Sequence, residues 1–367
     1  MRVQNLDLLE DQTTGDKIPL ALDPYYFLRV AETMAEPGDM PECDSFRIIP
    51  SEECRGWHPE QLHPGSSILI HKIVSVFDGD FTLRQGHAIN PVVFFALGLF
   101  VYFLLISKLT KSRLTAIIAS LFLAFTPMYL YRTMAGFADH EAIGMFGFYL
   151  LLLGFIVSLN YINKNFEKTD KKTFRNKILY GILTGFLIAF SIACWRGISN
   201  FAFMIIPLSL LIFWFVKRKS TNSLKKLGII PLFYIISLLV MFLITPLISG
   251  NTFSDIISRY MLSSQGIISV FVLGFLVIDY LMIYLNKRKF IKVDKKYEIL
   301  TSFIVLFLAG AVLLAITGEL SIIGEIFDRL LNPFGGGRVG GTVAENQSPS
   351  LNQWINQTGK TFFWIFI

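Results

Sequence analysis

Charged residues are scarce in this chain: Asp, Glu, Lys and Arg make up only 16% of its 367 residues, whereas hydrophobic residues make up 53%. A soluble domain of ordinary composition carries about 25% charged residues. The mean hydropathy is positive, and apolar runs recur at about 20 residues, the length that crosses roughly 30 Å of hydrocarbon. The composition therefore excludes an ordinary soluble protein and predicts a polytopic membrane protein.

Cysteine is also rare, since the chain has only three. That number is too small for a disulfide framework. Cys43 and Cys54 lie in one polar segment, and they could pair if this segment is extracytoplasmic.

Eight apolar segments predict an all-α fold with about eight transmembrane helices. A further apolar run begins at Thr361, and we interpret residues 361–367 as the start of a truncated transmembrane helix. The eight segments are residues 90–108, 114–131, 142–162, 178–194, 201–216, 228–249, 267–285 and 299–317.

The loops between these segments alternate in charge. The loops after the first, third, fifth and seventh segments hold 20 Lys or Arg, whereas the opposite set holds three, namely Arg132, Arg196 and Arg259. Because short cytoplasmic loops collect Lys and Arg, the first set is expected to be cytoplasmic. The net charge of +6 therefore reflects the membrane topology. We expect the chain to associate with a membrane and not with nucleic acid.

This topology divides the chain into four parts, the last of which is the truncated span at residues 361–367, and places it as a multi-pass protein of the cell membrane. Residues 1–89 form a large extracytoplasmic first loop with an apolar, amphipathic stretch from Ser66 to Phe77 suited to the membrane surface. Residues 90–317 form the transmembrane domain. Residues 318–360 form the last, fifth extracytoplasmic loop, which is Gly-rich and suited to act as a catalytic lid.

Asp139, His140 and Glu141 form a short polar gap between two apolar segments, at the extracytoplasmic surface. Asp139 could be an ordinary N-cap of the following helix. Alternatively, two carboxylates one residue apart offer hard oxygen ligands to Mg²⁺ or Mn²⁺. His140 is a candidate neighbour or ligand of the same site, and an active site here would face the extracytoplasmic side.

Other polar residues on the same side carry weaker signals. Asp23 precedes a proline and an aromatic run, a pattern that also opens turns. Glu345 follows a glycine-rich stretch, and it could be an ordinary loop acid. We interpret Asp78-Gly79-Asp80 as a turn. The remaining histidines, which show no ligand spacing, are interpreted as scattered polar loop residues; they are His58, His63, His71 and His87.

Taken in order, the motifs resemble the catalytic subunit of oligosaccharyltransferase, nearest to the archaeal AglB type and more distantly to bacterial PglB. They are D-P-Y-Y in the first external segment, D-H-E in the second external loop, C-W-R-G-I-S-N after the fourth span and T-V-A-E-N-Q in the fifth loop. The resemblance covers about Asp23 to Gln347. It implies a GT-C glycosyltransferase fold and inverting, metal-dependent transfer of a glycan en bloc. The implied donor is a dolichol (pyro)phosphate-linked oligosaccharide, and the implied acceptor is the Asn of an N-x-Ser/Thr sequon.

The resemblance also implies roles for individual residues. Asp23, Asp139 and Glu141 match the family's metal-binding acids, although Ala21 stands where the family usually has glycine. Glu345 matches the glutamate that engages the acceptor. We assign Asp23 and Glu345 the catalytic role of accepting the two N–H hydrogens of the acceptor amide, which localises its nitrogen lone pair. Mn²⁺ or Mg²⁺ is the implied cofactor, acting as a Lewis acid.

Arg338 is a candidate contact for the lipid phosphate, although a solvated loop arginine is an equal alternative. The family's W-W-D-Y-G motif is absent. We therefore expect a fragment that lacks the C-terminal acceptor-reading domain, and the activity of the chain alone stays open.

Three alternatives remain. Another GT-C enzyme, using a dolichol phosphate monosaccharide, would not need T-V-A-E-N-Q. A transporter or flippase for lipid-linked sugars would predict charged or broken helices at mid-membrane, whereas the expected spans are nearly free of charge apart from Asp279. The third alternative is an inactive membrane half of an enzyme.

Overall fold

The computed structural model describes residues 1–37, 41, 44, 62–221, 223–249, 252–317, 324 and 350–366. Within these ranges the chain is helical and forms no strand, apart from an isolated antiparallel bridge between Glu10 and Lys17. The helices are η1 (Asp7–Leu9), α1 (Leu22–Ala35), α2 (Leu62–Val74), α3 (Leu83–Thr110), α4 (Arg113–Phe125), α5 (Pro127–Tyr131), α6 (His140–Lys164), α7 (Lys171–Cys194), α8 (Ile198–Ser220), α9 (Leu224–Leu227), α10 (Ile229–Ser249), α11 (Phe253–Asp255), the π-helix η2 (Ile256–Met261), α12 (Ser264–Lys287), α13 (Glu298–Thr317), α15 (Leu351–Thr358) and α16 (Lys360–Phe366).

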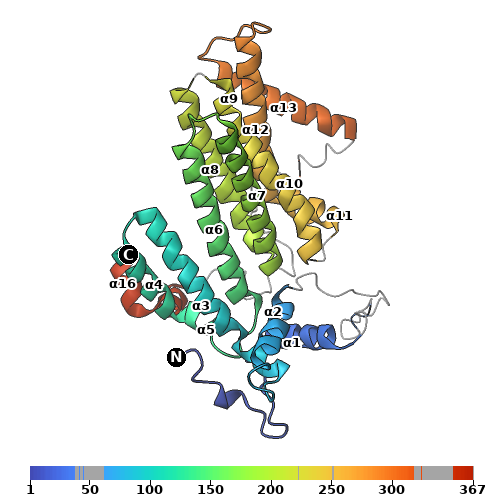
Figure 1. Ribbon diagram of the computed structural model, residues 1–367, viewed down its shortest axis with the longest axis vertical. Coiled ribbons are helices and arrows are strands. Elements are labelled where there is room, and N and C mark those ends of the chain that lie inside the picture. Colours follow the sequence, from blue (N-terminus) through green and yellow to red (C-terminus); the bar gives the residue numbers. More distant parts are fainter. Residues whose placement is uncertain are drawn as a thin grey trace.

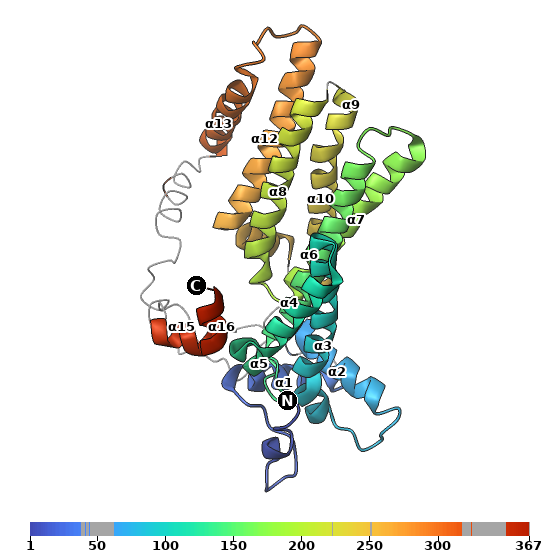
Figure 2. The same ribbon diagram turned by 90° about the vertical axis from the view of Figure 1, so that its left-hand side faces the viewer.

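Six of the expected spans are helices long and apolar enough to cross a membrane: α3, α6, α7, α8, α9 with α10, and α12. The other two expected spans coincide with the shorter apolar stretches Arg113–Phe125 and Glu298–Val312. Most of the long helices run side by side along the long axis of the molecule (Figure 1). Helices α1 and α2 lie at the end of this bundle where α6 begins, and the turned view agrees (Figure 2).

The second expected span, residues 114–131, is not one helix. Helix α4 ends at Phe125, and α5 begins at Pro127 after the extended residue Thr126. Proline lacks a backbone N–H and favours the first position of a helix, which explains a new start at this point. Arg2 packs at the break, because its Nη2 donates to the carbonyl of Ala124 over 2.8 Å and its guanidinium lies 3.4 Å from the ring centre of Phe95.

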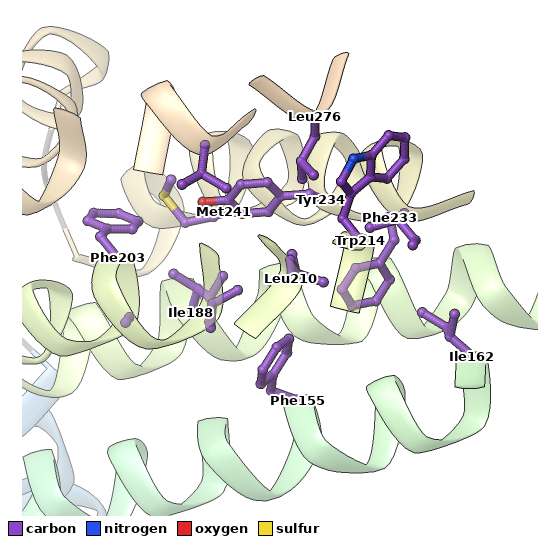
Figure 3. Close-up of a cluster of buried hydrophobic side chains, with 14 of the residues drawn as sticks. Phe155, Ile162, Ile188, Phe203, Leu210, Trp214, Phe233, Tyr234, Met241 and Leu276 are labelled. Carbon is purple, nitrogen blue, oxygen red and sulfur yellow. The ribbon is translucent and has the colours of Figure 1, made fainter. Parts of the chain in front are cut away.

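The largest hydrophobic core lies between α6, α7, α8, α10 and α12 (Figure 3). Trp214, Phe203 and Phe233 are among its fully buried side chains. Helices α7 and α10 approach closely at Gly185, where an added Cβ would lie 2.4 Å from the carbonyl oxygen of Ser237. Small residues at such crossings are typical of membrane helices, whose association depends on close backbone packing.

Asp279 of α12 is fully buried, and its charge is compensated by neighbouring helices. Its Oδ2 accepts hydrogen bonds from Trp214 Nε1 over 2.9 Å and from Arg218 Nε over 2.8 Å, and its Oδ1 accepts one from Ser302 Oγ over 2.8 Å. Arg218 Nη2 also lies 3.0 Å from Glu298 Oε2. The network joins α8, α12 and α13, so the acid predicted inside a span has partners on two neighbouring helices, as a buried ionisable group among membrane helices requires.

Candidate functional site

Asp139, His140 and Glu141 lie where α6 begins, and each offers a ligand atom within 4.8 Å of the others. His140 Nδ1 lies 2.8 Å from Asp139 Oδ1. Carboxylate oxygens with one imidazole nitrogen form a donor set that suits Mn²⁺, and the two carboxylates alone suit Mg²⁺. Among the described residues, this is the group of His, Cys, Asp and Glu side chains that could hold a metal ion.

Glu141 provides an observation that fits a cation-binding site. Its Oε1 accepts a hydrogen bond from Arg132 Nη1 over 2.7 Å. Its Oε2 is buried and has no hydrogen-bond partner among the described residues. A buried carboxylate oxygen without a partner is costly, so an ion bound between Glu141 and Asp139 would satisfy it.

Asp139 serves as the N-cap of α6 and also faces this cluster. Its Oδ1 accepts a hydrogen bond from the backbone N–H of His140 over 2.7 Å, and the side chain is buried. Burial alone would raise the pKa of Asp139, but the hydrogen bond and charge of His140 outweigh burial and lower this pKa below its usual value. The ordinary cap and the candidate ligand are therefore the same carboxylate, and neither interpretation excludes the other.

The start of α1, which carries Asp23, is attached to the start of α6. The backbone N–H of Leu20 donates to the carbonyl of Gly136 over 2.9 Å. One turn beyond Asp23, the ring of Phe27 lies edge-on to His140, with centroids 5.8 Å apart. Asp23 itself is exposed, in the first turn of α1, and it is not part of the group within 4.8 Å.

Two histidines that the sequence analysis interpreted as scattered loop residues belong to helices next to this site. His63 of α2 is 0% exposed and His87 of α3 is 1% exposed. Burial lowers the pKa of His63 to about 4, so its imidazole is neutral at physiological pH. The earlier interpretation is wrong because both side chains face neighbouring helices. A polar residue near the start of an apolar segment, as His87 is, was the signal for a buried role.

Trp195 of the C-W-R-G-I-S-N motif lies against the same site. Trp195 is the C-cap of α7, and its ring centroid lies 5.1 Å from that of His140. Gly144 of α6 makes room for it, since an added Cβ there would lie 2.7 Å from Trp195 Cβ. Spacing along the sequence gave no indication that this tryptophan contacts the acidic cluster.

The remaining predicted site residues have separate outcomes. Glu345 and Arg338 lie outside the described residues, as do Cys43 and Cys54. Asp78-Gly79-Asp80 forms an exposed turn, as predicted.

These features define a multi-pass α-helical membrane protein with an acid-rich cluster where one span begins. Residues 10–340 match the family described as oligosaccharyl transferase STT3, N-terminal. The chain belongs to this STT3 family, as the sequence motifs predicted.

Two curated relatives are dolichyl-phosphooligosaccharide-protein glycotransferases. The Methanococcus voltae protein is 23% identical over 234 residues, which are 61% of this chain and 24% of that protein. The Methanocaldococcus jannaschii protein is 28% identical over 210 residues, which are 53% of this chain and 22% of that protein. The matched region thus spans less than a quarter of the length of either relative.

Solved structures show the same fold. The oligosaccharyltransferase AglB of Archaeoglobus fulgidus, in complex with an inhibitory peptide and a dolichol-phosphate, has a TM-score of 0.66 at 18% identity. The match covers 99% of this chain and 42% of AglB. An Archaeoglobus fulgidus oligosaccharyltransferase in complex with Zn and sulfate has a TM-score of 0.56 at 18% identity. This match covers 87% of this chain and 38% of the solved chain. These likenesses confirm the expected all-α, GT-C-like membrane fold.

Proposed function

We propose that this chain carries the catalytic acids of an oligosaccharyltransferase. The enzyme transfers a glycan en bloc from a dolichol (pyro)phosphate-linked donor to the Asn of an N-x-Ser/Thr sequon. Membership of the STT3 family and the names of the curated relatives support the reaction class. The observation that carries the site is the buried, unpartnered Oε2 of Glu141 beside Asp139.

Asp139 and Glu141, with Asp23 from the adjoining helix and His140 as a further ligand, hold Mn²⁺ or Mg²⁺. When bound, the ion supplies Lewis-acid stabilisation of the negative charge on the departing phosphate, an effect worth several kcal/mol. Of the two ions, Mn²⁺ suits His140 better, because imidazole is a poor ligand for Mg²⁺. The Zn named with the Archaeoglobus fulgidus structure is compatible with a site that includes an imidazole.

The acceptor nitrogen needs activation, because its lone pair is delocalised into the carbonyl of the carboxamide. Asp23 and Glu345 accept its two N–H hydrogens in charge-assisted hydrogen bonds, which are about twice as strong as neutral ones. The amide nitrogen then forms a bond to the anomeric carbon while the bond from that carbon to the phosphate oxygen breaks. The electron pair of the broken bond leaves with the lipid phosphate, and one of the two amide protons passes to the carboxylate of Asp23 or Glu345. A single displacement of this kind inverts the anomeric configuration. Arg338 contacts the lipid phosphate.

The active site faces the extracytoplasmic side of the cell membrane. The basic loops after α3, α6, α8 and α12 support this orientation, because α6 begins at the end of the bundle opposite to the loop that follows it (Figure 1).

Replacement of Glu345 with Gln tests the acceptor role. The E345Q variant loses transfer to an N-x-Thr peptide and keeps its binding of the lipid-linked donor, since the amide cannot accept a charge-assisted bond at the same strength. The matched control is Glu319→Gln, a second acid of the segment that follows α13, and it retains transfer. Unchanged turnover in E345Q contradicts the assignment.

A further inference from the structure

Two buried histidines donate hydrogen bonds to backbone carbonyls beside the candidate acids. One carbonyl is next to Asp23 at the start of α1, and the other is next to Asp139 at the start of α6. His87 Nε2 lies 3.0 Å from the carbonyl oxygen of Pro24, which directly follows Asp23. His63 Nε2 lies 3.0 Å from the carbonyl oxygen of Ala138, which directly precedes Asp139. The two imidazole centroids are 6.0 Å apart.

The hydrogens on these rings follow from their partners. A carbonyl oxygen only accepts, so Nε2 carries the hydrogen in both histidines. His87 is buried, and a buried imidazolium without an acid beside it is strongly disfavoured. Its Nδ1 is therefore an acceptor, and Ser67 Oγ, 3.0 Å away, donates to it.

The side-chain amide of Asn90 connects the hydrogen bonds of His87 with those of the backbone at His63. Asn90 Nδ2 donates to Ser67 Oγ over 3.1 Å and to Ser66 Oγ over 2.7 Å. Ser66 Oγ in turn donates to the carbonyl of His63 over 2.6 Å. Asn90 is 0% exposed, so bulk solvent does not reach its amide hydrogens.

Helix spacing and a glycine make this arrangement fit. His63, Ser66 and Ser67 recur at three- and four-residue intervals and so share one face of α2. Helices α2 and α3 approach closely at Gly86, where an added Cβ would lie 3.1 Å from the carbonyl oxygen of Ser67. Buried polar groups without hydrogen bonds carry a large penalty, which the bonds of His87 Nδ1, Ser67 Oγ and Asn90 Nδ2 avoid. His63 Nδ1 and Asn90 Oδ1 are buried without a hydrogen-bond partner among the described residues.

We propose that His87, whose Nδ1 is held by Ser67 and Asn90, and His63 are positioning residues that hold the starts of α1 and α6 in register for metal binding. The proposal rests on the metal site proposed above. A network that only stabilised the fold would affect the melting temperature and leave the affinity of a folded site for its ion unchanged.

Substitutions of His87 separate these two roles. In the His87→Gln variant the side-chain amide nitrogen reaches about as far as Nε2, so the bond to Pro24 is kept. In His87→Asn the amide is one carbon shorter and the bond is lost. We expect the H87N variant to bind Mn²⁺ at least tenfold more weakly than the wild-type chain, and H87Q to recover affinity to within about threefold.

The measurement is Mn²⁺ titration of the purified chain in detergent, followed by electron paramagnetic resonance, with the melting temperature in EDTA recorded for each variant. His71→Asn is the matched control, since His71 lies two turns beyond His63 on α2, and it binds as the wild type does. Ser67→Ala is a milder second variant in case H87N does not fold, and we expect it to bind about threefold more weakly.

The Asp139→Asn variant distinguishes an error in the positioning role from an error in the metal site itself. Loss of Mn²⁺ binding in D139N with wild-type affinity in H87N and S67A overturns the positioning role alone. Wild-type affinity in D139N, or no Mn²⁺ binding by the wild-type chain, overturns the metal site and the positioning role together.

Discussion

The backbone N–H of Leu20 donates to the carbonyl of Gly136 over 2.9 Å, and each of these residues lies three positions before a candidate catalytic acid. Leu20 precedes Asp23 at the start of α1, and Gly136 precedes Asp139 at the start of α6. Two segments more than 100 residues apart in the chain are thereby joined directly beside the site. The contact gives the acids a common framework without requiring their side chains to touch.

Gly136 is expected to be intolerant of a side chain. Its φ of +84° lies in the left-handed region, and an added Cβ would lie 2.5 Å from Leu9 Cδ1. Gly136→Ala should destabilise the protein by about 1–3 kcal/mol, which thermal unfolding in detergent measures. Gly15→Ala is the control, because Gly15 has a φ of +73° and no neighbour within 4 Å. Equal losses in both variants would show that the packing against Leu9 contributes nothing.

Asp139→Asn separates the two roles of this residue. Asparagine is as good an N-cap as aspartate, so we expect the melting temperature in EDTA to change little. The charged oxygen ligand is lost, so the affinity for Mn²⁺ should fall by more than tenfold. Asp80→Asn, in the exposed turn, should leave this affinity unchanged. Calorimetric titration measures the affinity of both variants, and a wild-type affinity in D139N would overturn the metal site.

Arg218→Met should be strongly destabilising, because it leaves the fully buried carboxylate of Asp279 without its counter-charge. Loss of one partner of a buried ion pair costs about 3–5 kcal/mol. Adding Asp279→Leu should recover part of this loss, whereas Lys219→Met at an exposed neighbouring position should be neutral. Thermal unfolding of the wild type, R218M, D279L and the double variant gives the coupling, and additive effects would argue against the pair.

The proposed orientation predicts opposite accessibility for two exposed loops. In a chain with Cys43 and Cys54 replaced by serine, an impermeant maleimide should label Asp80→Cys in intact cells. It should label Lys295→Cys only after lysis, since the loop after α12 is expected in the cytoplasm. The buried native Cys194 should not react. The reverse pattern would place the acidic cluster on the cytoplasmic side.

Hydropathy and charge were sufficient to predict the helical bundle, because span length and loop charge are local properties of the sequence. The interruption at Thr126 was missed, although Pro127 marks it, because the apolar character continues across both short helices. The partner of Asp279 was also missed. Arg218 is 61 residues away in the sequence, and it belongs to a basic cluster that is typical of a cytoplasmic loop.

The site was only partly predictable. Asp139 and Glu141 are neighbours in sequence, so their grouping needed no tertiary information. Burial of His63 and His87 depends on how α2 packs against α3, and scattered histidines carry no spacing that indicates it. The same holds for Trp195, which reaches His140 from the end of α7.

The central claim is metal-dependent glycan transfer by this chain. Its most direct test is to incubate the purified protein with a lipid-linked oligosaccharide extract and a fluorescent N-x-Thr peptide, first with Mn²⁺ and then with EDTA. We predict a glycopeptide with Mn²⁺, its loss in EDTA and its return when Mn²⁺ is added back. No glycopeptide with Mn²⁺, or an equal yield in EDTA, would contradict the account.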